Sequence, residues 1–159
     1  GPKILADVHI RVDPRITVSE GHRIGDEVIS RLKNTFVELD DVVVHVDPED
    51  DTESLPTVFL PLRHVIEEKV SNCLSDLQIE LGSRPSLRPL NLVLHYLNGK
   101  YHLEIWLAMP DNSSVGSTET FSQKIAQRIL SIEEVSNVCV LFSSDPSLHE
   151  RPHPDLLKP

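Results

Sequence analysis

The chain has 159 residues, which is the length of one ordinary domain or of two small ones. Its formal net charge of −10, without a basic cluster, makes nucleic acid and anionic membrane surfaces poor partners. Two cysteines without a CxxC motif exclude a disulfide framework and favour a reducing compartment, and no apolar stretch reaches the ~18–20 residues of a membrane helix.

The chain begins with a strand–helix–strand pattern. Residues 4–12 alternate apolar and polar side chains, which predicts a strand with one apolar face. Thr17 and Glu20 form a capping-box pattern that predicts the start of a helix. Residues 42–46 are rich in valine and predict a second strand. A crossover of this kind predicts a parallel pair of strands.

Acidic side chains surround this second strand. Residues 38–53 contain eight carboxylates and no lysine or arginine. Like charges gathered there repel one another until a cation binds, which is what a metal switch requires. For the part beyond Glu49, a solvated acidic linker is the alternative interpretation.

The rest of the chain predicts a helix, two strands, a helix and a strand. These elements cover residues 62–81, 90–97, 100–109, 118–130 and 137–142. Asn98-Gly99 between the two strands is the strongest short signal of a β-hairpin. A two-residue turn there brings His95 opposite His102, for which a second metal pair and an ordinary surface pair are both open interpretations.

The strand–helix–strand pattern occurs twice. At a fixed offset, residues 6–12 lie over residues 103–109, and residues 28–32 lie over residues 125–129. Two copies of one supersecondary unit are the simplest interpretation. The first copy, of about 50 residues, buries too little apolar surface to be stable alone. We therefore expect a fragment of a longer protein, without a helix and a strand that precede residue 1.

Two histidines and an aspartate share one face of the first strand pair. His45 and Asp47 are two residues apart on one strand, and His9 lies on the equivalent face of the other. Two imidazoles and one carboxylate suit Zn²⁺ first and then other first-row metals. Carboxylates close by are expected to give outer-sphere or charge support: those of Asp7, Glu49 and Asp50.

Three strings carry these residues: ADVHIRVDP at 6–14, TVSEGH at 17–22 and VVVHVDP at 42–48. In motif and spacing they resemble the cytoplasmic C-terminal domain of the cation diffusion facilitator (CDF) transporters. The likeness covers residues 1–50 well, whereas residues 60–145 match only in the order of their elements.

The resemblance implies a ferredoxin-like α+β fold (an α/β sandwich) in two tandem units, the first of them N-terminally truncated. The expected organisation is a partial metal-binding unit, an acidic and proline-rich linker, a complete second unit without the ligands and a disordered tail. These parts cover residues 1–50, 51–61, 62–144 and 145–159, respectively.

The resemblance also implies the site and its role. The metal ligands carried over are His9, His22, His45 and Asp47, with Glu49 as a weaker candidate beside His22. His22 ranks below the others, because its helix covers the opposite face and it reaches the site only at the sheet edge or from a second subunit. The resemblance implies that a divalent metal ion draws two copies of the chain together. Zinc is the first expectation, and iron, manganese, cobalt, nickel and cadmium are the alternatives.

The partners implied are a second copy of the chain and the membrane domain of the same transporter, on the cytoplasmic side of an inner or plasma membrane. The implied function is metal sensing that favours transport, and not catalysis. Two alternatives stay open on the sequence alone. One is a metal-dependent hydrolase, and the other is a ferredoxin-like oligomerisation or small-molecule module in which the histidines are incidental.

The second copy retains the apolar pattern and loses the ligands. At the positions of the four candidate ligands it has Trp106, Glu119, Leu141 and Ser143. We therefore expect the second copy to act as a scaffold or an interface. Of the other histidines, His64 is expected to be exposed on a helix, and His149 and His153 fall in the proline-rich tail.

Overall fold

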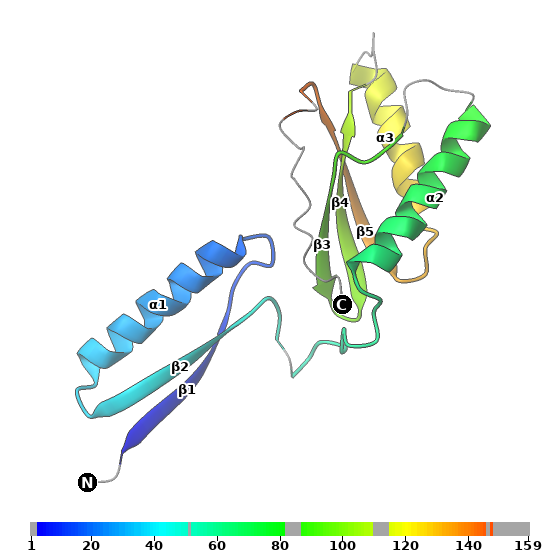
Figure 1. Cartoon of the computed structure of the whole chain (residues 1–159). Helices are drawn as coiled ribbons and strands as arrows, with labels where there is room; N and C mark the ends of the chain where they lie inside the picture. Colours follow the sequence, from blue (N-terminus) through cyan, green and yellow to red (C-terminus); the bar gives the residue numbers. More distant parts are fainter. Residues whose placement is uncertain (1–2, 51, 82–86, 110–114, 146, 148–159) are drawn as a thin grey trace. The chain divides into compact units, whose positions relative to one another are not determined.

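The computed structural model describes residues 3–50, 52–81, 87–109, 115–145 and 147. The chain divides into two compact units, Gly1–Pro56 and Thr57–Pro159 (Figure 1). Both units combine helices with sheets, which confirms the predicted α+β class and is compatible with ferredoxin-like units. Among the helices of the described ranges, none has the length and apolar character that crossing a membrane requires.

The first unit consists of two parallel strands connected by one helix. Strand β1 spans Ile4–Arg11, helix α1 spans Val18–Thr35 and strand β2 spans Leu39–Asp47. The helix begins at the predicted position, because the side chain of Thr17 accepts a hydrogen bond from the backbone N–H of Glu20. The parallel pairing of β1 and β2 agrees with the predicted crossover.

Helix α1 packs closely on one face of this strand pair. Gly21 and Gly25 are the buried positions of the helix, and a Cβ atom added there would lie 3.4 Å and 3.5 Å, respectively, from side-chain carbons of Val46. The helix therefore covers the face that carries Val44 and Val46, and the alternate side chains of β2 point to the other face. Of the hydrophobic side chains described in this unit, Val42 alone is buried.

The second unit is a three-stranded sheet with two helices. In chain order its elements are α2 (Arg63–Leu81), β3 (Asn91–Leu97), β4 (Lys100–Ala108), α3 (Val115–Ile129) and β5 (Val135–Ser143). Strand β4 is central and pairs antiparallel with β3 and parallel with β5. The predicted hairpin turn is present: φ is 48° at Asn98 and 68° at Gly99, as a two-residue turn of type I′ requires.

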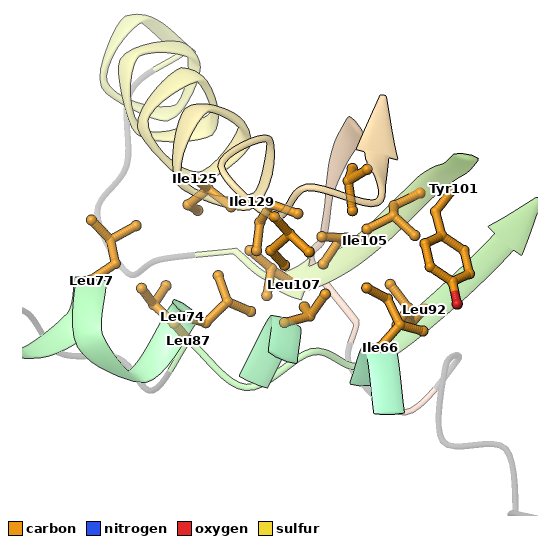
Figure 2. Close-up of a cluster of buried hydrophobic side chains, with 14 residues drawn as sticks. Ile66, Leu74, Leu77, Leu87, Leu92, Tyr101, Ile105, Leu107, Ile125 and Ile129 are labelled. Atoms are coloured by element: carbon orange, nitrogen blue, oxygen red, sulfur yellow. The ribbon is translucent and has the colours of Figure 1, made fainter. Parts of the chain in front are cut away.

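This second unit holds a continuous hydrophobic core. Helices α2 and α3 lie on the same face of the sheet, and Figure 2 shows their side chains meeting those of the strands. Five of these core side chains are at most 1% exposed: Ile66 and Leu74 of α2, Ile105 of β4, and Ile125 and Ile129 of α3. Burial of this kind is the main source of stability in a domain of this size.

Part of the predicted linker packs with the second unit. Leu60 lies against the core, and the Tyr101 hydroxyl donates a hydrogen bond to the carbonyl oxygen of Pro61. Burial raises the pKa of Tyr101 to about 12, so this hydroxyl remains a donor at neutral pH. The boundary between the compact units accordingly lies at Pro56 and Thr57, inside the predicted 51–61 segment.

Some predicted element boundaries differ from those of the structure. Helix α3 begins at Val115, before the predicted 118, and β5 begins at Val135, before the predicted 137. Strand β5 extends because Val135 already pairs with Tyr101 of β4. Backbone pairing sets this boundary, and the polar residues at the start of β5 gave no apolar pattern to reveal it.

Candidate metal centre

His9 and His45 lie directly opposite each other on the parallel strands β1 and β2. Their imidazole rings stack, with centroids 4.5 Å apart and ring planes inclined by 14°. Because side chains alternate along a strand, both rings lie on the face opposite Val44 and Val46, the valines that contact α1. The structure thus brings together two of the histidines that the sequence singles out.

Each of these imidazoles contacts a carboxylate of the other strand. Nδ1 of His9 lies 2.8 Å from Oδ2 of Asp47, and Nε2 of His45 lies 2.9 Å from Oδ1 of Asp7. This crossed arrangement follows from the register. Asp7 comes two residues before His9 and Asp47 two residues after His45, so the carboxylates stand at opposite ends of the histidine pair.

Three side chains already have the spacing of a metal site. One donor atom from each of Asp7, His9 and His45 lies within 4.8 Å of the other two, and all three side chains are exposed. Two nitrogens and one oxygen suit Zn²⁺, and three protein ligands leave room for water or a further ligand. The sequence predicts only a supporting role for Asp7, whereas the structure places it among the three candidate ligands. The alternation along β1 could have indicated this, because it puts Asp7 on the same face as His9.

Asp47 is less exposed than Asp7. Its side chain is 22% exposed, compared with 69% for that of Asp7. It contacts Nδ1 of His9, and a carboxylate contact of this kind orients a metal-binding imidazole and fixes its tautomer. The sequence-based assignment of Asp47 as a ligand remains a prediction, and the structure places its carboxylate next to a candidate ligand.

Replacing Asp47 with asparagine is expected to weaken zinc binding by about 10–100-fold, the usual effect of losing a carboxylate that orients a metal-binding histidine. Isothermal titration of the full chain measures this change. The matched control is Glu27→Gln on α1, which removes a carboxylate of the same unit that contacts Arg23 and Arg31 instead. Equal affinities for Asp47→Asn and the unaltered chain would contradict a role for Asp47 in the site.

The neighbouring acidic residues have partners of their own. Hydrogen bonds from the side chain and the backbone of Thr52 lower the pKa of Asp50, and Arg11 lies 3.9 Å from the Asp50 carboxylate. A hydrogen bond from Lys33 likewise lowers the pKa of Asp41. These exposed contacts offset part of the like-charge repulsion expected from the acidic run.

His22 and Glu49 lie outside the group of three. His22 is exposed on α1, with Nε2 3.7 Å from Oδ2 of Asp26. Glu49 is half-buried just beyond the end of β2. Within one chain neither side chain places a donor atom with those of His9 and His45. A joint site with His22 therefore needs a second copy or a rearrangement.

The remaining histidines divide between described and undescribed parts of the chain. His64 is exposed on α2, as expected. His95 and His102 pair across the β3–β4 hairpin, also as expected. His149 and His153 lie outside the described residues, together with most of the predicted disordered tail.

Comparison with known proteins gives matches to metal-transport proteins. Residues 1–49 match the family described as "Cation efflux protein, cytoplasmic domain". "Metal tolerance protein C1" of Arabidopsis thaliana is 26% identical over 141 residues, which are 82% of this chain and 29% of that protein. "Uncharacterized transporter YdbO" of Bacillus subtilis (strain 168) is 40% identical over 50 residues, 31% of this chain and 17% of that protein. No solved structure matches significantly.

These matches confirm the resemblance found in the sequence. The likeness of residues 1–49 is to the cytoplasmic domain of the cation efflux, or cation diffusion facilitator, proteins. Of these two relatives, one is named as a metal tolerance protein and the other as a transporter. The chain spans less than a third of the length of either relative.

Proposed function

We propose that the first unit is the divalent-metal-sensing part of a cation efflux transporter. The observation that carries the proposal is the group formed by Asp7, His9 and His45, whose donor atoms lie within 4.8 Å of one another inside the segment that matches the family. All three side chains lie on an exposed sheet face, so the site can exchange metal with the surrounding solution.

Zinc is the proposed metal. Two imidazole nitrogens and one carboxylate oxygen form a borderline-soft ligand set, which suits Zn²⁺ in a tetrahedral site with one further ligand. Iron, manganese, cobalt, nickel and cadmium remain alternatives. Affinity alone does not select Zn²⁺, because Cu²⁺ binds nitrogen and oxygen ligands more tightly. The geometry of the site and the supply of each metal therefore decide which ion is bound.

Metal binding is proposed to draw two copies of the chain together. Three protein ligands on an open sheet face leave at least one coordination position, which a second copy fills. His22 is the candidate for that donor, since it lies away from the group within its own chain. The matched family carries dimerisation in its name, ZT_dimer. We propose that the unit lies on the cytoplasmic side of the membrane and that the approach of two copies acts on the membrane domain of the same transporter.

The second unit is proposed to be a degenerate repeat of the first. Both parallel pairs shift register at equivalent places, between Ile4 and Leu5 in β1 and between Tyr101 and His102 in β4. The fixed offset between the repeats relates these two places. An irregularity retained at one position supports a common origin more strongly than apolar periodicity does.

The register also supports the loss of the site in the second unit. His9 pairs with His45 in the first unit, and Trp106 pairs with Leu141 at the equivalent place in the second. An apolar pair thus replaces the two imidazoles in an otherwise matching backbone. Among its described residues the first unit has no counterpart of α2 and β3.

Zinc titration as a function of pH tests the proposed sensor. Affinity is expected to fall steeply as the pH drops below ~6.5, where a free imidazole takes up a proton and loses its lone pair. With two histidine ligands, the loss approaches about 100-fold per pH unit in that range. Isothermal titration at several pH values measures it. An affinity that does not change with pH, or no zinc binding at all, contradicts the proposal.

A further inference from the structure

The face of the second sheet opposite its two helices carries a separate group of side chains that can bind a cation. His95 of β3 pairs directly with His102 of β4, and Glu104 lies two residues further along β4. Alternate residues of a strand share a face, so all three lie on the face opposite the core residue Leu103. The hairpin turn fixes this register and therefore holds the three positions together.

His95 is the unusual member of this group. Its side chain is 14% exposed, and among the described residues its Nε2 atom is buried without a hydrogen-bond partner. Such atoms are rare in native proteins, because a buried polar atom that makes no hydrogen bond destabilises the fold. Oε1 of Glu104 lies 3.6 Å away, which is too long for a hydrogen bond.

The separation between these two atoms is that of two ligands on one metal ion. Ligands about 2.1 Å from a tetrahedral zinc ion lie about 3.4 Å from each other. Nε2 of His95 and Oε1 of Glu104 are 3.6 Å apart, so both reach one ion after a shift of a few tenths of an ångström. A cation placed there satisfies the buried nitrogen and neutralises the carboxylate.

We propose that His95, Glu104 and His102 form a second site for a divalent cation, separate from the site in the first unit. His95 and Glu104 are the two ligands already in place, and water completes the coordination. His102 is half-buried, and a change of its side-chain rotamer brings it in as the third ligand. The change is required because the donor atoms of His95, His102 and Glu104 do not yet lie close enough together for one ion. Among the described residues, only Asp7, His9 and His45 of the first unit have three donor atoms within 4.8 Å of one another.

The comparison of the two units supports this assignment. Glu104 occupies in β4 the place that Asp7 occupies in β1, since Asp7 pairs with Val43 and Glu104 pairs with Cys139 at equivalent register positions. A carboxylate therefore stays on the same strand in both units. Its imidazole neighbours come from the parallel strand in the first unit and from the antiparallel hairpin in the second.

The experiment uses the full chain with His9→Ala and His45→Ala, in which the first site is removed. This background is expected to bind one zinc ion per chain in isothermal titration. Adding Glu104→Gln, which keeps the size of the side chain and removes its charge, is expected to weaken that binding at least about tenfold. The matched control is His64→Ala, which removes an exposed histidine of the same unit and is expected to change nothing.

Two outcomes would overturn the second site. One is that the background variant binds no zinc, in which case the contact between His95 and Glu104 is an ordinary cross-strand contact. The other is zinc binding that neither Glu104→Gln nor His102→Ala weakens. Because the background lacks both histidines of the first site, each result is independent of the sensor proposed for the first unit.

Discussion

Replacing His45 with alanine is expected to weaken zinc binding to the first unit by more than about 100-fold, because even an outer partner of a metal ligand contributes about 10–100-fold. His45 supplies one of the three donor atoms that lie within 4.8 Å of one another. Its loss leaves one imidazole and one exposed carboxylate, which is too few ligands to hold zinc against water. Isothermal titration or competition with a chromogenic chelator measures the effect.

The matched control for this change is His64→Ala. His64 is an exposed histidine on α2 and is far from Asp7 and His9 in the sequence. Circular dichroism of both variants shows whether the fold is retained. If His45→Ala binds as many zinc ions as the unaltered chain and binds them as tightly, the histidine pair is not the site and the proposed sensor is wrong.

Replacing Ile105 with alanine is expected to lower the free energy of unfolding of the second unit by about 2–5 kcal/mol, the range found when a large aliphatic side chain is removed from a core. Ile105 is 0% exposed at the centre of β4, within the core formed with α2 and α3. The change removes apolar burial and leaves a cavity. Urea denaturation followed by circular dichroism measures the loss.

The same residue type at an exposed position provides the control. Ile79 on α2 is 79% exposed, so Ile79→Ala is expected to change the free energy of unfolding by no more than about 0.5 kcal/mol. Similar destabilisation by Ile79→Ala and Ile105→Ala would contradict the assignment of the core to this side of the sheet.

Much of the fold follows from local signals in the sequence. The capping residue Thr17, the turn Asn98-Gly99 and the alternation along β1 and β4 each act over a few residues, and the structure agrees with them. The first residues of β5, of which Ser136 and Asn137 are polar, could not be predicted in this way. That segment is a strand because it pairs with β4, which is remote in sequence.

The candidate site was predictable in part for the same reason. Alternation along two strands places His9, His45 and Asp47 on one face, and the structure shows that face to be shared. The contact between His45 and Asp7 depends on the register between β1 and β2, including its shift between Ile4 and Leu5. Sequence periodicity gives the face of a side chain, but not its level along the neighbouring strand.

The buried nitrogen of His95 lay beyond sequence reasoning. The hairpin turn predicts that His95 and His102 face each other, and the structure agrees. How deeply the His95 ring is buried, and how close Glu104 comes to it, depend on side-chain packing across the sheet face opposite the two helices. Those two features turn an ordinary cross-strand pair into a candidate site.

Sedimentation velocity of the full chain with and without zinc tests the central claim most directly. Zinc is expected to shift the unaltered chain towards a dimer, and the His9→Ala and His45→Ala variants are expected to show no such shift. The contradicting result is zinc binding at Asp7, His9 and His45 that leaves the sedimentation coefficient unchanged, since the metal then occupies the site without drawing two copies together.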